Sequence, residues 1–98
     1  MVPVPARSLT LACRARPSAH VRLQRTGDES VLLDLASEQY FGLDAVGTRV
    51  WQLLETDSDV QAAHAALVSE YDVDAAQLEA DLLALLGQLA DAGLIHLE

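Results

Sequence analysis

The sequence predicts an α+β fold of the winged helix-turn-helix type, in which a three-stranded antiparallel sheet is followed by three α-helices. Two observations predict it. Residues 20–43 contain three short apolar segments separated by turns, and residues 45–92 contain three segments with the apolar period of helices. A sheet this small is not stable alone and must be covered by helices. With 98 residues the chain is expected to form one domain.

The three predicted strands cover residues 20–25, 31–35 and 39–43. In the first strand Val21 and Leu23 alternate with polar residues, which is the two-residue period of a half-buried strand. Gly27 lies in the first turn and can supply a positive φ there. Residues 36–38 form the second turn. Because both turns are short, the strands are predicted to form an antiparallel meander.

The first predicted helix covers residues 45–55 and begins after Asp44, a residue type that commonly caps helices. Gly47 is unfavourable inside a helix by about 1 kcal/mol relative to alanine, so close backbone packing is expected at this position. Trp51 lies to one side of the apolar stripe and is interpreted as a core anchor, with ligand stacking as the alternative. The stripe consists of Val46, Val50, Leu53 and Leu54.

Capping signals delimit the other two helices. Residues 58–61 read S-D-V-Q, which fits a capping box opened by Ser58. The apolar side of this second helix is Val60, Ala63, Leu67, Val68 and Tyr71. Asp74 is expected to cap the third helix, which runs to residue 92, and Gly93 followed by an apolar residue predicts a Schellman stop. Residues 95–97 are expected to be a short extended segment.

The third helix has a wider apolar face than a surface helix needs. One stripe is Leu78, Leu82, Leu85 and Leu89, and the second is Leu83, Leu86 and Ala90. Together they span roughly 160°, whereas about 100° is enough to cover a core. The second stripe either completes the helix–sheet core or forms, with the edge of the last strand, an apolar groove. Gln77, Asp81 and Gln88 would border that groove.

The last strand, residues 39–43, carries two of the three Tyr and Phe rings and passes directly into a helix. If it lies at the edge of the sheet, its unpaired backbone groups can accept an incoming peptide as an added strand. Alternation alone leaves open whether Tyr40 or Phe41 faces the groove. This edge is the candidate working surface.

Residues 1–17 are expected to be a flexible or weakly ordered basic arm, since they contain all three prolines. Within it, residues 9–13 could add a weak strand. The domain proper is expected at residues 18–98. Cys13 is the single cysteine, so an internal disulfide is excluded and a reducing cytoplasm is expected. No apolar run approaches the length of about 18 residues that a membrane span needs.

Charge divides the chain unevenly. Residues 1–27 contain five arginines and no acid, whereas residues 28–98 contain all fifteen acids and only one cation, Arg49. An acidic body repels nucleic acid, because phosphate binding depends on cations. It can attract a basic peptide, or the acids can serve solubility alone.

The sequence shows no constellation for catalysis. His20, His64 and His96 are far apart and lack metal-ligand spacing, and no glycine-rich phosphate loop is present. Helix capping accounts for Asp44 and Asp74 without a proton-transfer role. We therefore expect a protein that is not an enzyme and that needs no metal or cofactor.

Several ordered motifs resemble the PqqD family, which supplies the precursor-recognition domains (RRE) of ribosomally made, modified peptides (RiPPs). They are V-L-L-D-L at 31–35, Y-F-G-L-D at 40–44, V-G-T-R-V-W at 46–51, L-L at 53–54, E-Y-D-V at 70–73 and D-L-L-A-L-L-x-x-L-A-D-A-G-L at 81–94. The resemblance covers residues 21–95. Two departures occur: Asp44 stands where the family usually has Asn, and the common glycine of the 36–38 turn is missing.

The resemblance implies a non-catalytic peptide chaperone that binds a precursor leader peptide as a strand beside the third strand and against the third helix. A free-standing copy is most similar to the leader-binding protein of lasso-peptide systems, whose implied partners are the precursor, a separate leader peptidase and an ATP-dependent cyclase. The predicted peptide-binding residues are Glu38, Gln39, Tyr40, Phe41, Gly42, Leu43, Asp81, Leu82, Leu85, Leu86 and Leu89.

Three alternatives stay open at this level. A related protein could serve another modified-peptide pathway, such as those with radical enzymes or a quinone cofactor. A winged-helix regulator could bind DNA through the basic arm, although the second and third helices carry no Lys or Arg. The free strand edge could also pair with a second copy of the chain.

Overall fold

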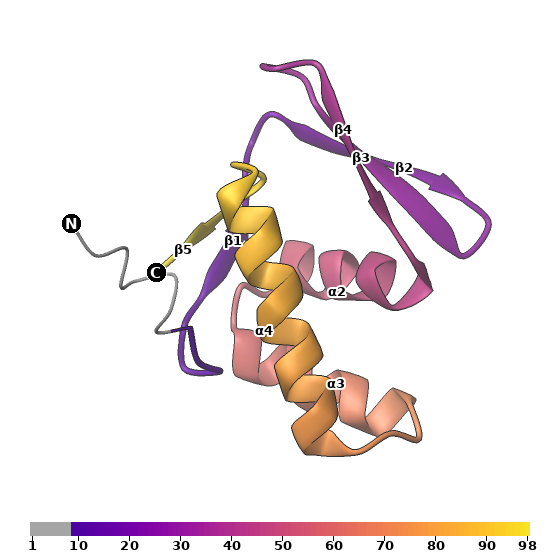
Figure 1. The fold of residues 1–98 in the computed structure, drawn as a ribbon, viewed down its shortest axis with the longest axis vertical. Coiled ribbons are helices and arrows are strands. Elements are labelled where there is room, and N and C mark those ends of the chain that lie inside the picture. Colours follow the sequence, from indigo (N-terminus) through magenta and orange to yellow (C-terminus); the bar gives the residue numbers. More distant parts are fainter. Residues whose placement is uncertain (1–8) are drawn as a thin grey trace.

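The computed structural model describes residues 9–98. Figure 1 shows the order of the elements. They are β1 (Ala15–Pro17), β2 (Val21–Thr26), β3 (Glu29–Asp34), β4 (Gln39–Leu43), α2 (Ala45–Thr56), α3 (Val60–Glu70), α4 (Ala75–Asp91) and β5 (Ile95–Leu97). The predicted α+β class, with a three-stranded antiparallel sheet before three helices, is confirmed; the winged helix-turn-helix label stays a prediction.

The main sheet is a meander in the order β2-β3-β4. Thr26 pairs with Glu29 across a two-residue turn, and Gly27 has φ 71°, so the predicted need for glycine there is confirmed. The turn between β3 and β4 requires the same left-handed backbone at Glu38, with φ 62°. An ordinary residue therefore occupies a conformation that favours glycine.

A second, two-stranded sheet joins the ends of the described chain. β1 pairs antiparallel with β5, which confirms the extended segment at residues 95–97. The predicted arm is corrected in part: the strand lies at Ala15–Pro17 rather than at residues 9–13, and Ala15 is fully buried, so the folded body extends N-terminal to residue 18. The part of the predicted arm before residue 9 lies outside the described residues.

Aspartates cap all three helices. Asp44 accepts a hydrogen bond from the N–H of Gly47, and Asp74 accepts one from the N–H of Gln77, as predicted. The prediction for α3 was wrong by one residue, because Asp59 is the cap and the hydroxyl of Ser58 instead accepts a hydrogen bond from Arg14. At the end of α4, Gly93 has φ 76°, and the N–H of Leu94 reaches the carbonyl of Leu89 at 2.9 Å. This geometry confirms the Schellman stop.

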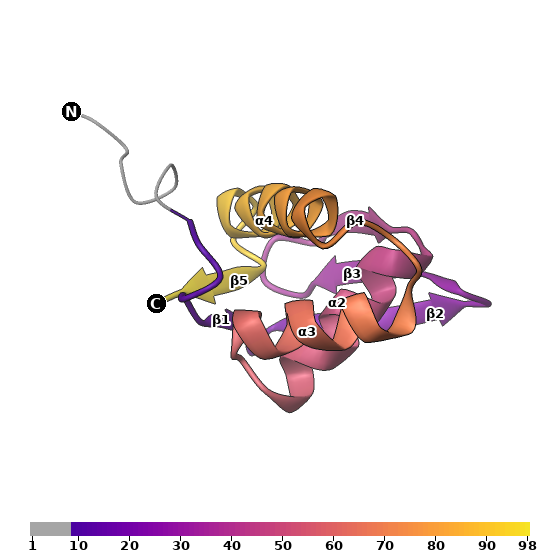
Figure 2. The same cartoon turned by 90° about the horizontal axis from the view of Figure 1, so that it is seen from below.

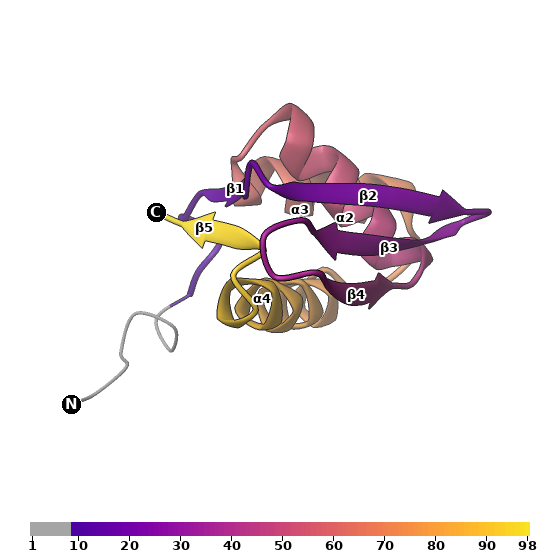
Figure 3. The same ribbon diagram turned by 90° about the horizontal axis from the view of Figure 1, so that it is seen from above.

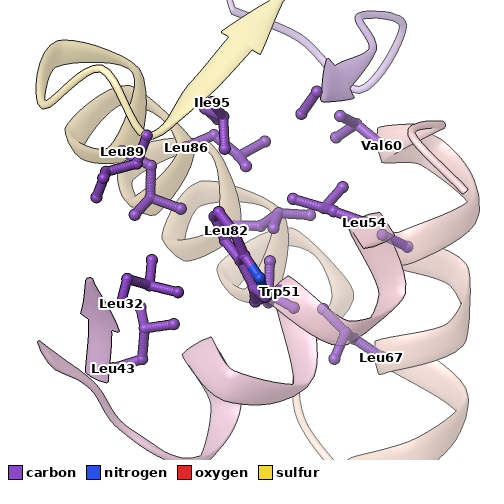
Figure 4. Close-up of a cluster of buried hydrophobic side chains, with 14 of the residues drawn as sticks. Leu32, Leu43, Trp51, Leu54, Val60, Leu67, Leu82, Leu86, Leu89 and Ile95 are labelled. Carbon is purple, nitrogen blue, oxygen red and sulfur yellow. The ribbon is translucent and has the colours of Figure 1, made fainter. Parts of the chain in front are cut away.

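The core lies where α2 and α4 meet the sheet. Figure 4 shows Leu82 of α4 beside Trp51 of α2, in a buried cluster that also contains Leu86 and Leu89 of α4 and Leu32 of β3. Trp51 is 1% exposed, which confirms the core-anchor interpretation. The buried stripe of α4 is Leu78, Leu82, Leu86 and Leu89. The first predicted stripe was therefore wrong at one position, since Leu86 occupies the place expected for Leu85.

Gly47 confirms the predicted close packing at the start of α2. A Cβ atom at this position would lie 3.1 Å from Cδ2 of Leu43 and 3.2 Å from the capping oxygen of Asp44. Both distances are shorter than ordinary van der Waals contact. A larger residue would push the end of β4 away from the helix that follows it.

The helices cover only one face of the three-stranded sheet (Figures 2 and 3). Ser30, Leu32 and Asp34 of β3 are buried on the covered face, whereas Leu35, just past the strand, is 50% exposed. On β4, Phe41 and Leu43 share the covered face, and Tyr40 is 74% exposed on the open one. The structure thus answers the question that alternation left open: Phe41, and not Tyr40, faces inward.

One buried polar contact fixes the sheet against α2. The hydroxyls of Ser30 and Thr48 lie 2.7 Å apart, and both residues are almost fully buried. We expect Thr48→Val to lower the free energy of unfolding by about 1–3 kcal/mol, because the partner hydroxyl is left unpaired. The double variant Ser30→Ala/Thr48→Val should lose less than the sum of the two single changes. Urea denaturation measures all three, and additive losses would contradict a direct coupling.

Candidate peptide-binding edge

β4 is an edge strand with a free side. Within residues 9–98 it pairs only with β3. The N–H of Leu35 bonds to the carbonyl of His20 on the β2 side, and backbone direction alternates along an antiparallel strand. By this alternation Ser30, Leu32 and Asp34 direct their backbone groups toward β4.

The partners of those three residues on β4 are Leu43, Phe41 and Gln39, whose backbone groups are thus used within the sheet. Tyr40 and Gly42 then direct their N–H and C=O groups away from β3. This outward side of β4 lies toward α4 (Figure 3). The edge can therefore accept a further strand without any change in the existing ladder.

A small cavity of about 90 Å³, which we call the hairpin pocket, lies at the start of β4. It is lined by Asp34, Ser37, Gln39, Tyr40, Phe41, Ala92 and Leu94. It joins the β3–β4 turn to the C-terminal end of α4.

Asp34 is the buried acid of the hairpin pocket. Burial raises the pKa of its carboxyl, but hydrogen bonds from the backbone of Ala36 and from the backbone and side chain of Ser37, together with nearby His20, outweigh this effect and hold the pKa below its ordinary value. The carboxylate is thus ionised at neutral pH. Its role is to accept the N–H groups of the turn, at 2.9 Å from Ala36 and 3.3 Å from Ser37.

A larger cavity of about 370 Å³, which we call the helical pocket, lies at the other end of β4. It is lined by Asp44, Val46, Gly47, Tyr71, Val73, Gln77, Leu78, Asp81 and Leu85. The buried or partly buried Val46, Leu78 and Leu85 form what we call its floor, and the exposed Asp44 and Asp81 form its rim. Val73 at the α3–α4 turn is 50% exposed. The volume falls in the range of about 300–1,000 Å³ that ligand pockets occupy. β4 thus runs from one pocket to the other.

The structure brings only some of the predicted site residues to this edge. Gln39 through Leu43 form β4, and Asp81 and Leu85 line the helical pocket. In contrast, Leu82, Leu86 and Leu89 are at most 2% exposed and belong to the core, so their side chains are not available to a docked peptide. The prediction placed them at the groove because the apolar pattern of a helix alone does not show which of two adjacent apolar stripes faces the core.

Glu38 does not extend the edge. Its φ of 62° turns the chain, and its N–H already bonds to the carbonyl of Asp34 at 2.7 Å. An L-residue other than glycine is strained there by about 1–2 kcal/mol.

We expect Glu38→Gly to raise the free energy of unfolding by about 1 kcal/mol, part of the relief being lost to the greater freedom of the unfolded chain. Glu38→Val should lower it, because a β-branched residue is poorly suited to this conformation. Thermal unfolding of both variants measures the effect, and equal midpoints would contradict the assignment of strain to this turn.

Sequence reasoning missed much of the helical pocket. The sequence could have indicated Val73, because an apolar residue between two aspartates in a turn is expected to be exposed. Tyr71 and Val46 were assigned only to helix faces, and their meeting depends on how α2 and α4 pack around the α3–α4 turn.

Two of the three histidines have structural contacts. Nε2 of His20 lies 3.5 Å from Asp34, and Nε2 of His64 lies 2.9 Å from the carbonyl of Ala75. Within residues 9–98 no group of three or more His, Cys, Asp or Glu side chains is arranged to hold a metal ion. None of the helices in that range is long and apolar enough to cross a membrane.

A small α+β domain with a free strand edge beside a helix and a cavity at each end of that edge has the features of the class of domains that bind peptides by strand addition. The family model described as Coenzyme PQQ synthesis protein D (PqqD) matches residues 29–95, and the chain belongs to this family. The match includes β3, β4 and all three helices. The resemblance found in the sequence motifs is thereby confirmed.

Relatives and solved structures agree with this assignment. The chain is 31% identical over 88 residues to the PqqA binding protein of Rhodopseudomonas palustris (strain ATCC BAA-98 / CGA009), covering 90% of this chain and 86% of that relative. It is similar to TbiB1, solved in complex with the TbiA(beta) leader peptide, with a TM-score of 0.78, 41% identity and coverage of 83% and 94% of the two chains. It is also similar to a lasso peptide synthetase B1 complexed with its leader peptide, with a TM-score of 0.75, 26% identity and coverage of 85% and 98%.

Proposed function

We propose that this protein binds the leader region of a ribosomally synthesised precursor peptide by adding it as a strand to β4. The free edge of β4 is the observation that carries the proposal, because Tyr40 and Gly42 present backbone groups that no described residue uses. The two similar solved structures, each of a protein with a leader peptide, support it.

The geometry sets the length of the bound segment. A strand rises about 3.4 Å per residue, so the five residues of β4 span roughly 17 Å. A peptide of about six residues therefore reaches from the hairpin pocket to the helical pocket. Its backbone would bond to Tyr40 and Gly42, and alternate side chains would turn inward toward Phe41 and Leu85.

The proposed role is non-catalytic. The protein would hold the precursor for a separate leader peptidase and an ATP-dependent cyclase of a lasso-peptide pathway in the cytoplasm, without a cofactor of its own. Holding the leader raises the effective concentration of the attached core peptide near those enzymes. The similarity to a lasso peptide synthetase B1 favours this pathway, and a chaperone of another modified-peptide pathway is the alternative.

DNA binding of the winged-helix kind has less support. α3 and α4 contain no Lys or Arg. Two arginines of the basic N-terminal quarter are already paired, Arg16 with Glu98 at 2.8 Å and Arg14 with Asp57 at 3.8 Å. These two pairs lower the positive charge that the N-terminal quarter offers to a duplex.

The test is a titration of the ¹⁵N-labelled protein with the TbiA(beta) leader and with the N-terminal segment of any short precursor reading frame found beside this protein's gene. We expect saturable binding of at least one leader, with the largest backbone shifts at Tyr40, Gly42 and the two pockets. A scrambled leader is the control. If neither leader binds, or if binding leaves the amides of β4 unchanged, the proposal is wrong.

A further inference from the structure

The helical pocket combines an apolar floor with a negatively charged rim. Val46 and Leu85 contribute to the floor, whereas Asp44 and Asp81 line the same cavity. No cation is among the residues that line it. Arg49, the sole Lys or Arg after residue 25, is bound to Glu70 by hydrogen bonds of 2.8 and 2.7 Å.

Each rim carboxylate is held in place but keeps an oxygen free. Oδ1 of Asp44 accepts a hydrogen bond from the backbone N–H of Gly47, with an N···O distance of 2.7 Å. Oδ1 of Asp81 accepts one from Nε2 of Gln77, with an N···O distance of 3.0 Å. Within residues 9–98, neither Oδ2 atom accepts a hydrogen bond from the protein.

The pocket lies next to the end of β4, since Asp44, which lines the pocket, directly follows Leu43. We infer that the helical pocket selects a peptide segment in which an apolar anchor residue is flanked by a Lys or Arg, the anchor filling the floor and the cation lying between Asp44 and Asp81. This inference rests on the proposed function and adds the chemistry of the ligand to it.

Physical arguments favour a cation over an uncharged neighbour. A peptide strand that covers the cavity removes water from both carboxylates, and an unpaired charge in a partly desolvated site is unfavourable. A Lys or Arg on the peptide offsets this cost with charge-assisted hydrogen bonds. An acidic leader segment at this position would instead be repelled. The two carboxylates would therefore discriminate between peptides in addition to strengthening the binding of basic ones.

The test is selection of random dodecapeptides displayed on phage against four proteins: the wild type, Asp44→Asn, Asp81→Asn and Asp59→Asn. Asp59 also caps a helix, α3, and does not line the pocket, so Asp59→Asn removes the same charge from an equivalent capping position. We expect wild-type and Asp59→Asn binders to carry Lys or Arg beside an aliphatic or aromatic residue. This preference should disappear in binders of the two rim variants.

A synthetic wild-type binder then gives the magnitude. Changing its cation to Gln should weaken binding to the wild type about fivefold, and Asp44→Asn should remove most of that difference. If the binders depend on the edge of β4 but lack the cation, this inference is wrong while the proposed function stands. If no binder depends on β4, as judged with the Gly42→Pro variant, both are wrong.

Discussion

Gly42→Pro should weaken leader binding by about tenfold or more while the domain stays folded. Proline removes the outward N–H of Gly42, which would donate to the added strand, and its ring occupies the edge where that strand must approach. The loss of one main-chain hydrogen bond and the steric conflict together amount to at least about 1.4 kcal/mol. The existing sheet should tolerate the change, since proline is accepted at edge positions whose N–H faces away from the ladder.

Gly42→Ala is the matched control for this prediction. A Cβ at Gly42 meets no atom within 4 Å, so alanine keeps the N–H without a clash. Fluorescence polarisation with a labelled TbiA(beta) leader compares the three proteins, and thermal unfolding checks their folding. Equal affinities for Gly42→Pro and Gly42→Ala would argue strongly against strand addition. Light scattering on the same samples shows whether the edge instead pairs with a second copy of the chain.

Leu86→Ala should mainly lower stability, whereas Leu85→Ala should mainly lower leader affinity, although the two residues are adjacent. Leu86 is fully buried, and its truncation is expected to lower the free energy of unfolding by about 2–5 kcal/mol through lost contacts and a cavity. Leu85 is half-buried and lines the helical pocket. Because it is only partly buried against the core, its truncation should cost much less stability than Leu86→Ala, and it should weaken leader binding about fivefold, as expected for an anchor contact.

Urea denaturation and polarisation titrations separate the two effects. If Leu86→Ala does not fold, Leu86→Met provides the same comparison with a volume-conserving change that costs less than about 1.5 kcal/mol. A loss of stability in Leu85→Ala as large as in Leu86→Ala, or a loss of affinity in folded Leu86→Met, would mean that the faces of α4 are assigned to the wrong partners.

Local signals account for the success of the sequence interpretation. Asp44, Asp74 and Gly93 act within one turn of a helix, and Gly27 acts within its own hairpin, so each could be interpreted without knowledge of the rest of the chain. The motifs added an ordered pattern over residues 21–95, and the matching PqqD family model confirmed it. The error at Ser58 has the same origin: two capping residues stand side by side, and the contact of Ser58 with Arg14, 44 residues away, favours Asp59 as the cap.

The sequence by itself thus determined the three strands of the main sheet, the three helices, their order and the family. Only the tertiary structure decided which sides of those elements meet. The assignment of Leu86 to the core and Leu85 to the pocket, the inward position of Phe41, and the joining of β1 to β5 all depend on contacts between residues far apart in the chain. The physical reason is that periodicity gives the width of an apolar face, whereas packing against a particular neighbour selects which part of that face is buried.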